Sequence, residues 1–143
     1  MKNLNNPINL IEKVDYAGLE TSSGNCGMFA LALREVLGSG DLVFVTNGSS
    51  PEYATDDDAE ENLMLGEPDI WHVALKVGDK LYDGTGEITI DDLDEIAYRE
   101  YGDVEPFLTV WSDVNEPEFY KIIRNNTNWF IDKDEFVNAM IKN

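Results

Sequence analysis

Apolar positions along the chain follow two periods, one typical of helices and one typical of strands. The clearest helix is predicted over Cys26–Leu37, where Phe29 and Leu33 recur at helical spacing and glycines flank the segment. Other segments carry caps, prolines or acidic first turns, which are helix-start signals. These further helices are expected over Pro7–Tyr16 with Asn6 as its cap, Asp91–Tyr101, Pro117–Arg124 and Lys133–Lys142.

Runs of β-branched and apolar residues predict strands. They are expected over Leu42–Thr46, Ile70–Val77, Lys80–Asp83, Glu87–Ile90 and Phe107–Trp111. The second and third are joined by Gly78-Asp79, and glycine in the first position of a two-residue loop is typical of a type II′ hairpin. Residues 52 to 69, with the acidic run Asp56–Asp58, are expected to form a solvated loop.

The order of these elements indicates the fold class. Helices lie near both ends of the chain and strands lie in the middle, which favours an α+β fold over an alternating parallel one. We expect a single domain over residues 1–143, with N-terminal helices packed on a small antiparallel sheet and further helices at the C-terminus.

Charge narrows the functional classes. The chain carries 29 acidic against 10 basic residues, a formal charge of −19, so it repels phosphate backbones and anionic lipid headgroups. We therefore expect no direct nucleic-acid binding and no membrane binding. The charge has two interpretations: solubility in an acidic proteome, or attraction of a basic partner, including mimicry of DNA.

Cysteine content and hydropathy indicate the compartment. A single cysteine, Cys26, allows no internal disulfide, which is typical of a reducing environment. The sequence has no apolar leader segment and no apolar run long enough to cross a bilayer. The expectation is a cytoplasmic protein without an anchor.

Cys26 is the first candidate for chemistry. It opens the predicted helix, where the dipole and unpaired backbone amides favour a thiolate over a thiol. The same region could hold an oxyanion, with the Cys26 amide as one donor and the Asn25 side chain as a second. A free cysteine taken alone is more often a buried structural residue, so a catalytic interpretation of Cys26 needs partners.

The hairpin register predicts those partners, His72 and Asp83. A two-residue loop pairs Ala74 with Asp83, so His72 and Asp83 become diagonal neighbours about 7 Å apart on one sheet face. An aspartate bonded to one imidazole nitrogen leaves the other nitrogen free to take a proton from a thiol. We expect Cys26 to pack over this face. The opposite face, which is expected to be buried independently, carries Val73, Leu75 and Tyr82.

Each of these two residues also has a structural interpretation. His72 alone is more often a half-buried, hydrogen-bonded histidine, and Asp83 alone is more often a turn residue. A catalytic role is favoured because the residues occur together. The only cysteine opens a helix, the only histidine lies near a strand start, and an aspartate follows at a position that places it on the same sheet face as the histidine.

Three motifs together resemble a known group of proteins. Gly24–Gly27 opens a helix, Trp71–Val77 holds the histidine and Leu81–Gly86 holds the aspartate. This order resembles the Cys, His, Asp order of transglutaminase-like proteins and arylamine acetyltransferases within the papain-like superfamily. It also resembles small members of that superfamily encoded by phages and mobile elements. The resemblance covers roughly residues 20 to 90.

The resemblance implies a role for each residue. Cys26 would be the nucleophile, His72 the base and Asp83 the residue that orients the histidine. The glutamine that papain-type proteases place upstream as an oxyanion donor is absent, with only Glu20 nearby. Among the activities of the superfamily, peptidase activity is therefore the one that the sequence supports least.

No metal or cofactor is expected. The segment Ile131–Phe136 resembles the end of a calcium-binding EF-hand loop, with Glu135 as its last ligand. Counting back from Glu135, however, puts Arg124 at the position of the first ligand and Trp129 at the position that requires glycine. One cysteine and one histidine cannot supply the usual zinc ligands.

Two function classes remain. The first is a cysteine-dependent acyl-transfer enzyme that hydrolyses, deamidates or transamidates an amide or isopeptide of a protein or small molecule; an effector that modifies a host glutamine would use the same residues. The alternative is a non-catalytic acidic interaction protein or inhibitor on a papain-like scaffold, which would bind a basic partner such as a nuclease or a defence factor.

Overall fold

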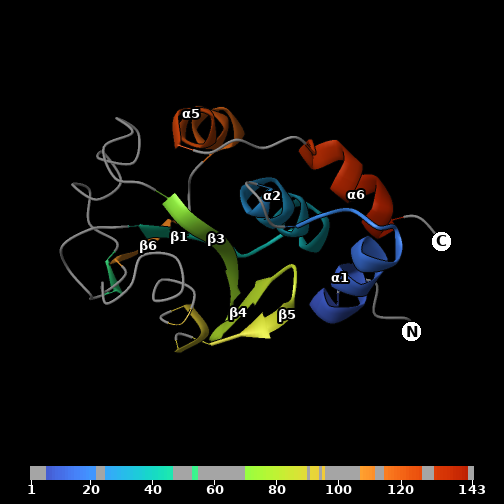
Figure 1. The fold of residues 1–143 in the computed structure, drawn as a ribbon, viewed down its shortest axis with the longest axis horizontal. Helices are drawn as coiled ribbons and strands as arrows, with labels where there is room; N and C mark the ends of the chain where they lie inside the picture. The colour runs from blue at the N-terminus through green and yellow to red at the C-terminus, as the bar shows by residue number, and fades with distance from the viewer. Residues whose placement is uncertain are drawn as a thin grey trace.

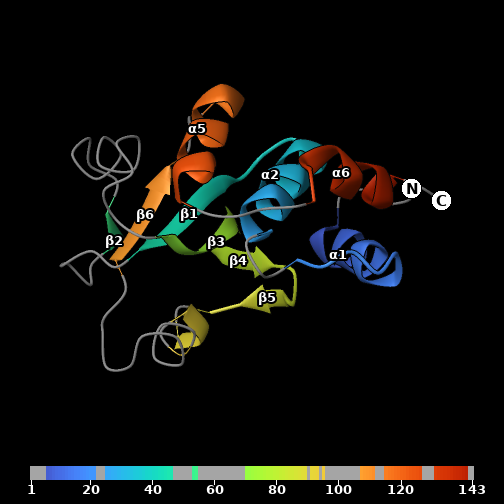
Figure 2. The same cartoon turned by 45° about the horizontal axis from the view of Figure 1, so that its top comes forward.

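The computed structural model describes residues 6–21, 25–46, 53–54, 70–89, 91–93, 95, 107–111, 115–126 and 131–141. The elements in chain order are α1 (Pro7–Tyr16), α2 (Cys26–Leu37), β1 (Asp41–Thr46), β2 (Tyr53–Ala54), β3 (Ile70–Val77), β4 (Lys80–Asp83), β5 (Gly86–Ile88), β6 (Phe107–Trp111), α5 (Glu116–Asn126) and α6 (Lys133–Ile141). The predicted α+β class is confirmed, with helices gathered beside one sheet (Figures 1 and 2).

Local signals account for the helix boundaries. The Asn6 side chain accepts a hydrogen bond of 2.9 Å from the Ile8 amide, so the predicted cap of α1 is confirmed. Helix α2 ends as predicted, because Gly38 takes the left-handed conformation, φ 79°, that terminates helices. Helices α5 and α6 differ from the predicted ranges by one or two residues at their ends. Residues 91–93 and 95 are helical, and the rest of Asp91–Tyr101 lies outside the described residues, as does the acidic run 56–58.

The described strands form one sheet in the order β2-β6-β1-β3-β4-β5. Strand β1 is central and pairs antiparallel with both β3 and β6. The sheet is antiparallel as expected except at its edge, where β2 pairs parallel with β6. The sequence did not indicate β2, which lies in a stretch without a strand pattern.

The two faces of the sheet bury different residues, because successive side chains of a strand point to opposite sides. Helix α2 packs on the face that carries Val73, Leu75 and Tyr82, within a cluster that also contains residues of α1, α5 and α6. Seven of the described residues form a second cluster on the other side: Val43, Val45, Ala74, Leu81, Ile88, Leu93 and Val110. The expectation that the Val73 face would be buried independently of the Cys26 helix is therefore wrong: α2 itself buries it.

Lys133 joins three helices at the first residue of α6. Its ammonium lies 2.6 Å from a carboxylate oxygen of Glu35 in α2 and 3.1 Å from Glu116 in α5, and only 9% of its side chain is exposed. Burial by itself lowers the pKa of Lys133, but the bonds to the two carboxylates outweigh it and raise the pKa well above its usual range. Lys133, in the segment that resembles the end of a calcium loop, thus forms an ionic clasp between α2, α5 and α6.

Candidate functional site

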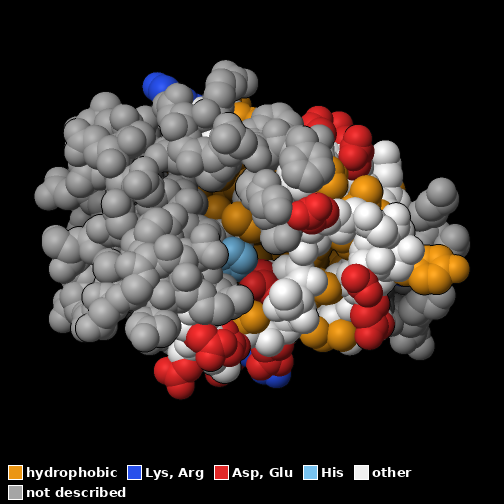
Figure 3. Space-filling model, in the orientation of Figure 1, with side chains coloured by type: hydrophobic (Ala, Val, Ile, Leu, Met, Phe, Trp, Pro, Cys, Tyr) orange, Lys and Arg blue, Asp and Glu red, His pale blue; other side chains and the backbone are white. Residues whose placement is uncertain are grey.

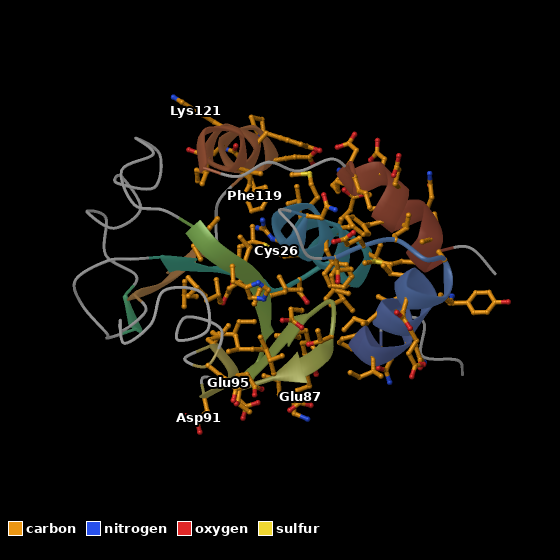
Figure 4. All side chains as sticks on the ribbon, in the orientation of Figure 1. Cys26, Glu87, Asp91, Glu95, Phe119 and Lys121 are labelled. Carbon is orange, nitrogen blue, oxygen red and sulfur yellow. The ribbon has the colours of Figure 1, made fainter. Side chains whose placement is uncertain are left out.

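Cys26 is the first residue of α2. The first amide of this helix that bonds back along the chain is that of Phe29, which donates to the Asn25 carbonyl over 3.0 Å. The amides of residues 26 to 28 therefore precede the intrahelical ladder and, with the helix dipole, create a positive potential around Cys26. Figure 4 shows Cys26 at this end of α2, beside β3. The residue is 9% exposed, at the edge of the main core cluster.

Asn25 anchors the start of α2. Its side chain is fully buried; the amide nitrogen donates to the Glu20 carbonyl over 3.1 Å, and the amide oxygen accepts from the Ile131 amide over 3.1 Å. The side chain thereby connects the segment that leads to Cys26 with the segment that leads to α6. The oxyanion role of Asn25 stays a prediction, while the observed bonds give the residue a positioning role for Cys26.

His72 and Asp83 meet as the register predicted. The loop of the hairpin holds two residues, Gly78 has φ 66°, and the pairs run from Val77–Lys80 to Leu75–Tyr82. The ring nitrogen Nε2 of His72 lies 2.9 Å from Oδ2 of Asp83. The predicted pair is confirmed: both side chains lie at the end of the hairpin away from its loop.

The Asp83 carboxylate is bonded through both oxygens. Its Oδ1 accepts bonds of 2.8 Å from the Thr85 amide and 2.5 Å from the Thr85 hydroxyl, while Oδ2 faces His72. Burial by itself raises the pKa of Asp83, but the bonds from His72 and Thr85 outweigh it and hold the pKa below its ordinary value. Asp83 is therefore a buried carboxylate that stays ionised at neutral pH.

Cys26 completes the group. Burial by itself lowers the pKa of His72, but the bond to Asp83 and the interaction with the neighbouring Cys26 side chain outweigh it, and they raise the pKa from 6.5 to about 10. Because Nε2 faces Asp83, Nδ1 is the ring nitrogen left to interact with the sulfur. The arrangement favours an imidazolium between a carboxylate and a sulfur atom.

The route by which His72 reaches Cys26 was not predicted. By strict alternation His72 belongs with Ala74, on the face away from α2. However, Thr46 pairs with Ile70 and Val45 pairs with His72, so β3 has an extra residue opposite β1 at this point. Such an irregularity bends a strand and re-aims its side chains. Here the irregularity lies immediately before His72, which itself stays in register opposite Val45, and the ring interacts with Cys26 on the helix-covered side.

Two glycines allow the close packing around these residues, and sequence reasoning gave them no role. A Cβ atom on Gly27 would lie 2.8 Å from Cδ1 of Ile123, so α5 packs directly against the first turn of α2. A Cβ atom on Gly84 would collide with the Thr21 side chain, so the turn after Asp83 lies against the segment that leads to Cys26. Their signal in the sequence is adjacency: each glycine follows one of the candidate residues.

The site is narrowly open to solvent. The His72 side chain is 15% exposed, and Figure 3 shows histidine atoms at the surface beside acidic and hydrophobic side chains. A pocket of about 550 Å³ lies elsewhere, at the C-terminal end of α2 between Gly38–Asp41 and Glu116, and none of the three candidate residues lines it.

Metal-ligand clusters and membrane-spanning helices are both missing from the part of the chain that the structure describes. There, no three or more His, Cys, Asp or Glu side chains are grouped so that they could hold a metal ion. No helix in the same ranges has the length and apolar character needed to cross a bilayer. No protein-family model, curated protein or solved structure matches the chain.

Proposed function

We propose that the protein is a cysteine-dependent acyl-transfer enzyme of papain-like or transglutaminase-like type that acts on an amide or isopeptide. The observation that carries the proposal is the 2.9 Å bond between His72 and Asp83 on an imidazole that also interacts with Cys26. A nucleophile, a base and a group that orients the base are the parts that nucleophilic acyl transfer requires.

In the first half of the reaction, the Cys26 sulfur attacks the carbonyl carbon of the acyl donor. The thiol proton resides on His72, the C=O π electrons move to oxygen, and a tetrahedral oxyanion forms. When the oxyanion collapses, the C–N bond breaks and the amine leaves with the proton from His72. The product is a thioester on Cys26.

In the second half, an acceptor attacks the thioester while His72 takes a proton from it. The C–S bond breaks, its electron pair returns to the Cys26 sulfur, and the proton stays on His72, as at the start of the reaction. Water as acceptor gives hydrolysis, or deamidation of a glutamine, and an amine gives transamidation. Asp83 keeps Nε2 protonated throughout, so that Nδ1 does the proton transfer.

The start of α2 supplies the electrostatic part of the mechanism. Backbone amides of residues 26 to 28 precede the helical hydrogen bonds, and donors of this kind stabilise a developing oxyanion. The Cys26 amide is the donor nearest to the attacking sulfur. Asn25 is the second donor in the proposal.

The test uses p-nitrophenyl acetate as a general acyl donor. We expect a burst of p-nitrophenolate and an acetyl group on Cys26, detected by intact-protein mass spectrometry and peptide mapping. Cys26→Ala should abolish the adduct, and His72→Gln and Asp83→Asn should slow it. Equal acylation rates in wild type and His72→Gln would contradict the proposal, because an ordinary thiol needs no histidine.

The second candidate function is binding of a basic protein, and the charge of −19 favours it. Three exposed acidic residues, Glu87, Asp91 and Glu95, lie toward one edge of the molecule (Figure 4). Attraction between exposed charges is screened beyond about 8 to 10 Å at ordinary ionic strength. Binding of this kind should therefore weaken steeply with salt, should be lost on reversal of the three charges to lysine, and should survive Cys26→Ala. A cellular phenotype with that pattern would overturn the enzyme.

A further inference from the structure

The turn between β4 and β5 places one side chain behind the aspartate of the site. Thr85 follows Asp83 by two residues and donates twice to the same oxygen, Oδ1, from its amide at 2.8 Å and from its hydroxyl at 2.5 Å. The other oxygen, Oδ2, bonds to His72 at 2.9 Å. Each carboxylate oxygen of Asp83 thus has its own partner residue.

The two bonds from Thr85 have different origins. A bond from the amide two residues on is common wherever an aspartate begins a turn, so it says little about function. The hydroxyl bond is not needed to close such a turn. Because it falls on the oxygen that already accepts the amide, it fixes the plane of the carboxylate and leaves Oδ2 directed at the imidazole.

On these contacts, and resting on the function proposed above, we infer that Thr85 is a positioning residue, whose hydroxyl holds the Asp83 carboxylate in the orientation that keeps His72 directed at Cys26. Thr85 itself is at the surface and touches neither the imidazole nor the sulfur in the described contacts. Its effect on the reaction passes through Asp83 alone.

A residue that only closes a turn and a residue that positions a base make different predictions. Loss of the hydroxyl from a turn changes stability slightly and leaves the imidazole unaffected. Loss of a positioning hydroxyl changes the state of His72. The chain has one histidine, so nuclear magnetic resonance of imidazole nitrogens reports on His72 without ambiguity.

The experiment compares wild type with Thr85→Val, which is isosteric without the hydroxyl, Thr85→Ser, which retains it, and Thr89→Val as matched control. Thr89 is also an exposed threonine whose hydroxyl takes part in a local bond, to the Asp92 amide at 3.2 Å, away from the site. Two readouts are taken for each: the titration midpoint of the His72 nitrogens, and the rate of Cys26 alkylation by iodoacetamide at pH 6.

We expect Thr85→Val to lower the His72 midpoint by about 0.5 to 1 unit and to slow alkylation about three- to tenfold. Thr85→Ser should restore both values, and Thr89→Val should match wild type. Thr85→Ala, which removes the hydroxyl with a smaller side chain, serves as a second variant if Thr85→Val does not fold.

Asp83→Asn separates failure of this inference from failure of the proposed function. If Asp83→Asn slows alkylation but Thr85→Val matches wild type in both readouts, the positioning role is overturned and the proposed function stands. A Thr85→Ser variant that behaves like Thr85→Val also overturns it, because the hydroxyl is then not the cause. If Asp83→Asn leaves alkylation unchanged, the proposed function is overturned.

Discussion

Two polar clusters lie at the two ends of α2, and they differ in whether the bonding capacity of the ionisable group is filled by fixed partners. Near the C-terminal end, the Lys133 ammonium donates hydrogen bonds to the carboxylates of Glu35 and Glu116, and Asp134 lies 3.8 Å from it. At the N-terminal end, Nε2 of His72 bonds to Asp83, which leaves Nδ1 to interact with Cys26. A buried ionisable group whose bonding capacity is filled by fixed partners stabilises structure. One that keeps a nitrogen for a nucleophile can also do chemistry.

The largest expected effect comes from His72→Gln. Removal of the base should lower the rate of Cys26 acylation by about 10²- to 10⁴-fold, because general-base assistance contributes on that scale. Stopped-flow detection of p-nitrophenolate measures it, with Lys133→Met as the control from the opposite end of α2. A loss of the same size in Lys133→Met would remove the functional distinction between the two clusters.

The next effect concerns Asn25. Asn25→Ala leaves the Ile131 amide and the Glu20 carbonyl without their partner, so the free energy of unfolding should fall by about 2 to 4 kcal/mol. Urea denaturation at pH 7 measures this. An oxyanion role predicts a further fall in the acylation rate of the molecules that remain folded, under conditions where urea curves show full folding. An unchanged rate per folded molecule would restrict Asn25 to positioning the start of α2.

Lys133→Ala should act on stability alone. The free energy of unfolding should fall by about 1 to 3 kcal/mol, below the range for fully buried ion pairs, because about half of each partner carboxylate is exposed. Lys133→Met, which retains the apolar stem, should recover part of this loss. The measurement is urea denaturation in low and high salt. If both variants are as stable as wild type, the clasp is not a stabilising feature.

The last prediction concerns the pH dependence of stability. The folded-state pKa of His72, about 10, is above its ordinary value of 6.5. Its stabilising contribution is therefore fully present below about pH 6.5 and is lost as pH rises through 10, at no more than about 1.4 kcal/mol per pH unit. Asp83 has the opposite sign: its pKa is depressed, so its contribution is present above its ordinary value of 3.8 and is lost as pH falls through the folded value.

Urea midpoints measured from pH 3 to pH 10.5 test both directions of the pH dependence. The control is His72→Gln, which lacks the contribution to stability that is lost at alkaline pH. In that variant, stability should change less between pH 6.5 and 10 than in wild type. Parallel curves for the two proteins over this window would contradict an imidazolium held between Asp83 and Cys26.

Local signals made much of the fold predictable. The caps and glycines around α1 and α2 and the two-residue loop at Gly78 act within a few residues of the positions they determine, so the bounds of these elements followed from the sequence. Strand β2 was not predictable, because its pairing with β6 joins segments some fifty residues apart and no local pattern reports it. The clasp of Lys133 was hidden for the same reason: Glu35 is 98 residues away.

By itself, the sequence determined the chemistry that is possible. One cysteine, one histidine and an aspartate at hairpin parity set the residue types, and the register of a two-residue loop brought His72 and Asp83 together. Only the tertiary structure decided how Cys26 joins them. Helix α2 packs on the opposite sheet face to the one expected, and Cys26 still interacts with the His72 ring from there. The physical reason is that register is a local property, whereas the face on which a helix packs depends on which side of the sheet buries more apolar surface with its neighbours α1, α5 and α6.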